Sequence, residues 1–184
     1  MTDLTKLYLY QGSKREEALA VGMWHQMHQD GDMDRTFQSG ITLTQLLQMF
    51  RPPNGMLYGI DDHGIWFSMW FELFMAGAVA GCWCRADKRH SRQLVATGMR
   101  AWGMLLTQFP CVFGVTKQEK LLKLHRIFGY TVLGKAPQLW DGKEDGWLLM
   151  LTREGHEAAI GRLGVGLTRW EMSHERLSRV DRPA

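Results

Sequence analysis

The 184 residues include only three cysteines, and the chain has no internal repeat and no low-complexity segment. Cys82, Cys84 and Cys111 cannot all pair, and one residue between the first two is not the spacing of a zinc knuckle. We therefore expect reduced, buried thiols in a cytoplasmic protein. The composition, 45% apolar and 22% charged, excludes a disordered chain, a collagen-like repeat and a disulfide-stapled mini-protein. The length is enough for one domain with a full core.

The sequence also lacks an N-terminal apolar core of the kind found in signal peptides, but one stretch needs a membrane test. Residues 65–84 carry a single charge, Glu72, and contain the small-residue pair Gly77 and Gly81 at the spacing seen in paired membrane helices. A turn signal at 61–64 and the aromatic and β-branched residues after it favour strands instead. Glu72 would also be costly in lipid. We therefore predict strands and no membrane contact.

Apolar periodicity and turn residues predict the order β-α-α-β-β-β-α-β-α-β-β, followed by an amphipathic tail. The predicted strands cover residues 6–10, 56–60, 65–74, 78–85, 112–116, 130–135 and 147–152, and the predicted helices cover 14–28, 42–50, 92–109 and 118–128. Such an order predicts an α+β fold, with a mostly antiparallel sheet and helices on its faces. We assign 1–154 to the domain and 155–184 to a tail that packs on it or on a second subunit.

Two serines mark predicted helix starts. Ser13 precedes a first turn that contains Glu16 and Glu17, which is typical of a capped N-terminus. Ser91 stands in the same position before the predicted helix over 92–109.

Positive charge is concentrated in one part of the chain. The segment 85–126 contains nine Lys or Arg and two acids, which leaves −4 on the rest of a chain of net charge +3. Such a cluster fits a phosphate-bearing ligand or a nucleic acid, and it equally fits a solvated helix face.

The sequence around the last predicted helix resembles a motif of the GCN5-related N-acetyltransferases, the GNAT superfamily. That family often has N-x-x-A-x-x-L-Y-x-x-x-G-F at this place in its element order. Here Gln118 replaces the amide, Leu121 the small residue and His125 the tyrosine, and Gly129-Tyr130 matches the glycine-aromatic pair. The resemblance covers roughly residues 5–153. It implies a three-layer GNAT-like fold with a mixed, mostly antiparallel sheet of about seven strands.

A second family signature is altered. The GNAT pyrophosphate loop, Q/R-x-x-G-x-G/A, begins the helix after the fourth strand, but residues 87–94 contain no glycine. Glycines let phosphate oxygens approach the N–H groups of a helix N-terminus. Lys88, Arg89 and Arg92 place three cations there instead, and arginine side chains can bind phosphate directly. Glycine-poor loops of this kind also resemble acetyltransferase-like proteins of phages and prophages.

The resemblance implies acetyl-CoA as cofactor and transfer of its acetyl group to the amine of a small molecule or peptide. In the family the pantetheine arm pairs with the fourth strand like an added strand. The expected cofactor-binding residues are therefore those at the end of that strand, in the basic loop and at the motif amide: Trp83, Cys84, Arg85, Lys88, Arg89, Arg92 and Gln118.

Two residues are candidates for catalysis. Glu72, the single charge of its apolar stretch, is the candidate base for the amine; the alternative is an outward-facing strand residue. His125, at the tyrosine position, is the candidate proton donor to the leaving thiolate, because imidazole titrates near neutral pH. Its alternative is a polar residue at a helix end of a non-catalytic relative.

Other readings of the sequence lead to different functions. The missing loop glycines favour a non-catalytic GNAT-like structural or regulatory protein of phage origin. A nucleic-acid-binding module ranks last, because no recognised binding motif is present, so we expect no nucleic-acid partner. His25 and His28 have the spacing of two metal ligands on one helix face, but we expect a polar flank and no metal site. The tail allows a homodimer.

Overall fold

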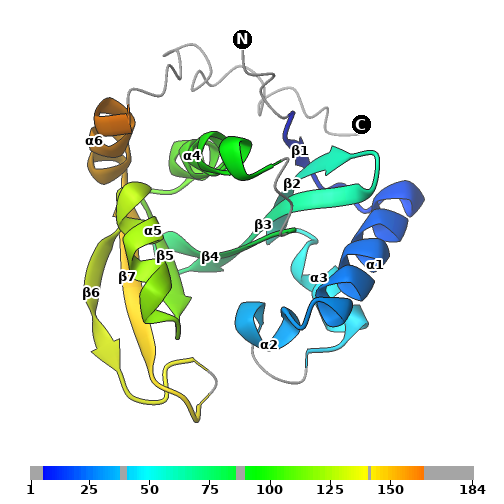
Figure 1. The fold of residues 1–184 in the computed structure, drawn as a ribbon, viewed down its shortest axis with the longest axis horizontal. Helices are drawn as coiled ribbons and strands as arrows, with labels where there is room; N and C mark the ends of the chain where they lie inside the picture. Colours follow the sequence, from blue (N-terminus) through cyan, green and yellow to red (C-terminus); the bar gives the residue numbers. More distant parts are fainter. Residues whose placement is uncertain (1–5, 38–40, 86–89, 141, 164–184) are drawn as a thin grey trace.

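One mixed sheet of seven strands organises the chain (Figure 1). The computed structural model describes residues 6–37, 41–85, 90–140 and 142–163, with Ser91 and Arg92 described by their backbone only. The strands are β1 (Tyr8–Leu9), β2 (Gly55–Asp61), β3 (Gly64–Phe74), β4 (Gly77–Cys84), β5 (Cys111–Thr116), β6 (Thr131–Ala136) and β7 (Gly146–Thr152). They pair in the order β1-β2-β3-β4-β5-β7-β6, antiparallel everywhere except between β4 and β5. The predicted α+β class and the mostly antiparallel sheet are confirmed.

Helices cover both faces of the sheet, so two apolar cores lie back to back (Figure 1). One face carries α1 (Lys14–Gln29), α2 (Met33–Thr36) and α3 (Leu43–Met49). The other carries α4 (Ser91–Gln108), with α6 (Arg153–Leu163) packed on it. The short helix α5 (Leu122–Ile127) follows the 3-10 turn η1 (Glu119–Leu121). These layers match the three-layer architecture that the sequence resemblance implied.

The parallel strands β4 and β5 stay paired over a short distance only. Ala78 lies opposite Val112 and Val79 opposite Phe113, and no further register pair joins the two strands in the described chain. Strand β4 pairs with β3 along its whole length, from Gly77 opposite Phe74 to Cys84 opposite Phe67. Beyond Val79, β4 therefore has a free backbone edge on its β5 side.

Local signals explain most of the helix ends. Ser13 caps α1 in a capping box with Glu16, as predicted. The predicted cap at Ser91 is wrong: His90 is the residue before α4, in helical conformation, and its side chain does not cap a backbone N–H of the first turn. The helix predicted over 118–128 begins as the 3-10 turn η1 and becomes α-helical only at Leu122.

Two further features differ from the sequence-based expectation. Helix α2 was not predicted, because four residues are too few to show a period. Helix α6 starts at Arg153 and buries His156 and Ala159. It therefore continues across residues 154 and 155, where the domain was predicted to end and the tail to begin. That division of the chain stays a prediction. Within the described residues no helix is long and apolar enough to cross a membrane, and the stretch 65–84 forms β3 and β4.

Candidate functional site

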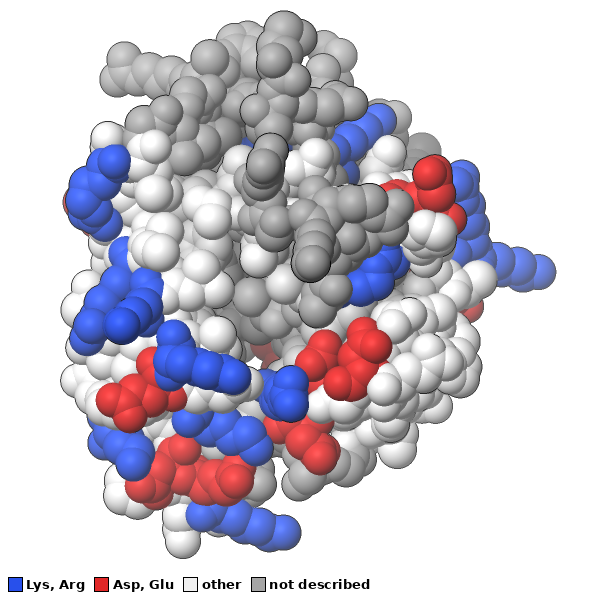
Figure 2. Space-filling model, in the orientation of Figure 1, with Lys and Arg blue, Asp and Glu red and all other residues white. Residues whose placement is uncertain are grey.

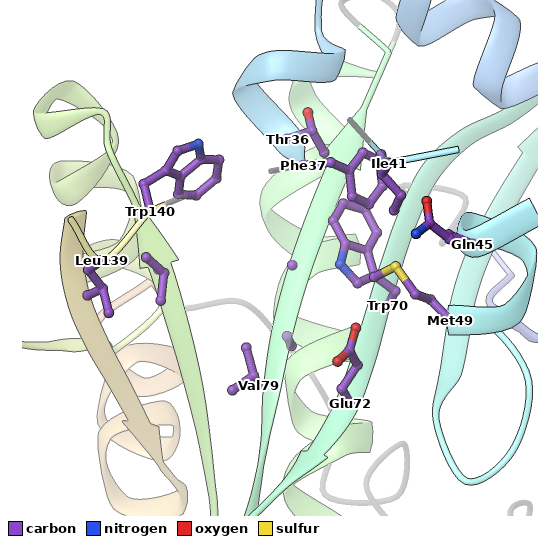
Figure 3. A pocket seen from close by; sticks show the side chains of 13 residues that line it. Thr36, Phe37, Ile41, Gln45, Met49, Trp70, Glu72, Val79, Leu139 and Trp140 are labelled. Atoms are coloured by element: carbon purple, nitrogen blue, oxygen red, sulfur yellow. The ribbon is translucent and has the colours of Figure 1, made fainter. Parts of the chain in front are cut away.

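A pocket of about 580 Å³ lies where β4 and β5 separate, on the face covered by α2 and α3 (Figure 3). Ala80 and Gly81 of β4 and Val115 of β5 all line it, so the strands have moved apart by this point. The remaining lining residues come from α2–α3, β3, β4 and the β6–β7 connection: Thr36, Phe37, Ile41, Gln45, Met49, Trp70, Glu72, Val79, Leu139 and Trp140.

The indole of Trp70 forms one wall of the pocket because its cross-strand neighbour is a glycine. Trp70 pairs with Gly81, and a Cβ on Gly81 would lie 2.6 Å from the Trp70 ring. Only a residue without a side chain allows the ring to lie across β4. Phe37, after α2, stacks on this indole with 4.5 Å between ring centroids and 28° between planes. The two rings make a continuous aromatic surface.

Glu72 carries the single charge among the described residues that line the pocket. It stands two positions after Trp70 on β3, so both side chains leave the same face of the strand, as Figure 3 shows. The side chain is half-buried, and no described residue forms a hydrogen bond or ion pair with it. An unpaired carboxylate among aromatic rings is a ready partner for a cation.

Trp140 and Leu139 form the wall opposite Phe37 and Ile41 (Figure 3). Trp140 is held from behind: Lys117 Nζ lies 5.8 Å from its ring centroid, and its backbone N–H donates to the Glu144 carbonyl at 3.0 Å. Lys117 is itself paired with the Glu144 carboxylate at 2.6 Å. These contacts join Trp140, Lys117 and Glu144 at this wall of the pocket.

The end of β4, where cofactor contacts were predicted, turns its side chains away from the cleft between β4 and β5. Trp83 is buried among α1 and α3, and its indole N–H donates to Asp32 Oδ2 at 2.9 Å. Cys84 packs into the core on the opposite face, where burial, with a contribution from Asp32, raises the pKa of its thiol. What β4 offers a ligand here is its backbone, with small residues at Ala80 and Gly81.

Arg85, another predicted cofactor ligand, instead forms an ion cluster with Asp61 and His90 that has little access to water. Its guanidinium donates to Asp61 Oδ2, and the same oxygen accepts a bond from His90 Nε2 at 2.8 Å. The His90 ring stacks on Trp66, with centroids 4.2 Å apart. Burial alone would raise the pKa of Asp61, but the bonds from His90 and the His63 N–H and the charge of Arg85 lower it overall.

The basic loop that follows Arg85 was predicted to bind phosphate. Lys88 and Arg89 lie outside the described residues, and so does the side chain of Arg92. Of the described Lys and Arg residues in the segment 85–126, Arg85 is paired with Asp61 and Lys117 with Glu144. On the face in Figure 2, blue and red side chains alternate and no single basic patch stands out among the described residues. The surface therefore gives no independent support to nucleic-acid binding.

The two motif residues on the β5 side lie away from the pocket lining. His125 Nδ1 is 2.7 Å from the Leu121 carbonyl, and since a carbonyl only accepts, Nδ1 carries the proton. Burial lowers the pKa of His125, partly offset by that bond, and the ring contacts Tyr130 edge-on. Gln118 follows β5, and its backbone N–H donates to Thr116 Oγ1 at 3.2 Å.

The sequence analysis missed most of the pocket. Phe37, Trp70 and Trp140 were not singled out, since nothing in their spacing distinguishes a pocket wall from a core. One signal was available: a glycine in the predicted strand at Gly81 marks a close approach by another group. Among the described residues there is also no group of three or more His, Cys, Asp or Glu that could hold a metal ion.

Comparison with known proteins gives matches of structure only. No protein-family model matches the sequence, and no curated protein does. An aminoglycoside N(6')acetyltransferase from Legionella pneumophila superimposes with a TM-score of 0.65 at 14% identity, over 86% of this chain and 98% of the other. The ribosomal-protein-S5-alanine acetyltransferase from Vibrio fischeri gives 0.62 at 12%, over 85% and 97%. An N-acetyltransferase from Staphylococcus aureus gives 0.61 at 11%, over 80% and 99%.

At these identities the likeness establishes the fold, and the strand order, the three layers and the separated parallel pair agree with it. The chain therefore has the fold of the GNAT acetyltransferases.

Proposed function

We propose that this chain is an acetyl-CoA-dependent N-acetyltransferase that transfers an acetyl group to an amine bound in the pocket beside Trp70 and Glu72. One observation carries the proposal: the free edge of β4 leads directly into a pocket whose only charge, among its described lining residues, is an unpaired carboxylate. A free strand edge suits a ligand with amide groups, and the carboxylate suits an ammonium.

The residues between β4 and β5 fit coenzyme A in part. The β4 backbone beyond Val79 has unpaired amide groups for the pantetheine amides, and the small side chain of Ala80 lines the pocket beside them. The pyrophosphate would lie at the start of α4, where the sequence provides Lys88, Arg89 and Arg92 in place of glycines. Trp83, Cys84 and Arg85 would contribute through their backbone, and Gln118 from the far side of the cleft.

When bound, acetyl-CoA supplies an acetyl group activated as a thioester. An amine that attacks it forms the amide N–C bond and releases the thiol as the C–S bond breaks. Most alkyl amines are protonated at pH 7, so the attacking nitrogen must first lose a proton. Glu72 would receive that proton, directly or through one water, and release it to solvent through the open pocket.

His125 was the candidate donor to the leaving thiolate. Its lowered pKa favours the neutral ring at pH 7, with Nδ1–H bonded to Leu121 and Nε2 without a proton. Protonation of Nε2 would be needed before it could donate. The role therefore predicts a rate that falls as the pH rises above the pKa of His125, and no such fall if His125 has no part in the reaction.

The test is an assay of acetyl transfer, carried out with a substitution that removes the charge of Glu72 and keeps its shape. Purified protein and acetyl-CoA are incubated with a panel of amines, and acetylated product is detected by mass spectrometry. Glu72→Gln keeps the side-chain shape and should lower kcat/KM by 100-fold or more, in line with the roughly 10²–10⁴-fold contribution of a general base. Glu157→Gln on α6, an exposed position, serves as the matched control and should leave it unchanged. No product from any amine would contradict the proposal.

A second candidate function is a non-catalytic protein that keeps the GNAT fold. Two observations favour it: Arg85 is tied to Asp61, and His125 is bonded within its own helix. This candidate predicts a folded protein that binds neither acetyl-CoA nor coenzyme A at millimolar concentration.

A further inference from the structure

The pocket beside Glu72 has a composition that selects among amines. We propose that it takes a compact amine with one positive charge on an apolar, preferably aromatic, body. This inference rests on the proposed function for the identity of the site, and it adds the chemical class of the acceptor.

The charge of the ligand follows from the charge of the pocket. Glu72 is the single ionised group among the described lining residues, and it has no partner within the described chain. One carboxylate can neutralise one ammonium. A ligand with several ammonium groups would place the others against apolar walls, where desolvation disfavours them.

The other polar side chains that line the pocket do not add to cation binding. Oε1 of Gln45 accepts bonds from the Thr42 backbone N–H at 2.8 Å and from its hydroxyl at 2.9 Å. This capping box directs the carbonyl oxygen to Thr42 and leaves the amide NH₂ as a donor, which repels an ammonium. Thr36 provides one hydroxyl. A hydroxyl-rich amino sugar would therefore lose more hydrogen bonds to water than the pocket returns.

The shape of the ligand follows from the aromatic walls. Phe37 and Trp70 form a stacked surface on one side, and Trp140 stands on the other (Figure 3). Ile41, Met49 and the Val79–Gly81 stretch close the remaining sides. A flat apolar body can insert between such walls, while its ammonium stays near both Glu72 and the face of an indole. The volume of about 580 Å³ is typical of a site for one small molecule.

The walls also have fixed positions, which favours a rigid ligand over an adaptable surface contact. Trp70 is confined by the backbone at Gly81 and by the ring of Phe37. Trp140 is held by Lys117 and by the Glu144 carbonyl. A pocket prepared in this way loses little entropy on binding a small, stiff amine.

Equilibrium binding of 2-phenylethylamine tests the inference, read by tryptophan fluorescence and calorimetry, with and without saturating coenzyme A. The comparison ligands are uncharged 2-phenylethanol, the polycation kanamycin and a tripeptide with a free N-terminal alanine. We expect saturable binding of 2-phenylethylamine that is at least tenfold tighter than that of each other ligand. Glu72→Gln should weaken it about tenfold without changing the affinity for 2-phenylethanol, the size expected for one charge-assisted bond. Glu157→Gln should change neither.

Trp140→Leu provides a second variant that keeps the carboxylate. It should weaken 2-phenylethylamine more than it weakens n-propylamine, which has the charge without the ring. Tighter binding of kanamycin or of the peptide, or equal binding of 2-phenylethanol, would overturn the inference. Absence of 2-phenylethylamine binding under both conditions would overturn it too.

These outcomes separate the two proposals. Binding of acetyl-CoA with a preference for kanamycin or the peptide would leave the acetyltransferase proposal standing and the acceptor class wrong. Binding of 2-phenylethylamine without any binding of acetyl-CoA would leave the pocket's selectivity standing and the transferase proposal wrong.

Discussion

His90 Nε2 lies 2.8 Å from Oδ2 of Asp61, the oxygen that also accepts the guanidinium of Arg85. Arg85 directly follows β4 and His90 directly precedes α4, so one carboxylate on the β2–β3 hairpin joins both ends of the basic loop. The three side chains are only 13–17% exposed. Asp61 thereby fixes the distance between the free edge of β4 and the start of α4, the two places where the proposed cofactor would be held.

Asp61→Asn should therefore destabilise the fold and weaken cofactor binding together. It removes the negative charge to which Arg85 and His90 bind, at a place with little access to water, and we expect a loss of about 2–3 kcal/mol in the free energy of unfolding. Urea denaturation measures it. Asp145→Asn is the matched control, since the Lys135–Asp145 pair is about half exposed and should contribute less than about 1 kcal/mol. Equal effects of the two variants on the free energy of unfolding would contradict a stabilising role for Asp61.

The same cluster predicts a dependence of stability on acid. The pKa of Asp61 is lowered in the folded protein, so the unfolded chain binds this proton more readily. The stabilising contribution is complete above the unfolded pKa of about 4 and is lost as the pH falls through the lower folded pKa. Urea unfolding at a series of pH values below 5 should show a shallower decline for Asp61→Asn than for the wild type. The same decline with pH in both proteins would contradict this contribution of Asp61.

Gly81→Ala should disturb the pocket through Trp70. The new methyl would lie 2.6 Å from the indole, which must shift, and a cost of about 1–3 kcal/mol in unfolding free energy is expected. The variant should also change the tryptophan emission. Gly22→Ala, in the exposed middle of α1 with nothing within 4 Å of the added Cβ, should instead stabilise by about 0.5–1 kcal/mol. If Gly81→Ala changed neither the free energy of unfolding nor the tryptophan emission, Trp70 would not lie across β4.

His125 should titrate below the ordinary histidine value. Burial lowers its pKa, so the neutral ring is favoured at pH 7. In an NMR titration its ring protons should shift with a midpoint below about 6.5, the reference value for histidine. The contribution of His125 to stability is complete above about pH 6.5 and is lost as the pH falls through the lower folded pKa. A midpoint above about 6.5 would contradict the effect of burial.

The sequence predicted the fold well because its signals are local. The period of α1, the capping box at Ser13, and the turns that bound β2 to β4 all act within a few residues. Helix α2 was missed because it is a single turn, and the predicted cap at Ser91 was wrong because α4 already begins at Ser91, directly after His90. The Gly-aromatic pair after α5 is explained by close approach, since a Cβ on Gly129 would meet the Gly155 carbonyl at 2.3 Å.

The candidate site was only partly predictable. Glu72 could be singled out because a lone charge in an apolar strand is conspicuous in the sequence alone. The direction of Trp83, the capture of Arg85 by Asp61 and the stacking of Phe37 on Trp70 depend on residues far apart in the chain. No spacing rule links such pairs, so their roles emerge only once the sheet and its helices are assembled.

The most direct test of the proposed function is a calorimetric titration of the purified protein with acetyl-CoA, beside the double variant Arg89→Ala/Arg92→Ala. The proposal predicts micromolar binding by the wild type and binding weaker by at least tenfold in the variant, because two phosphate-binding cations are lost. Thermal unfolding of both proteins without ligand should agree, so that the loss reports on the ligand. No heat of binding at millimolar acetyl-CoA from the folded wild type would contradict the proposal and leave a GNAT fold without its cofactor.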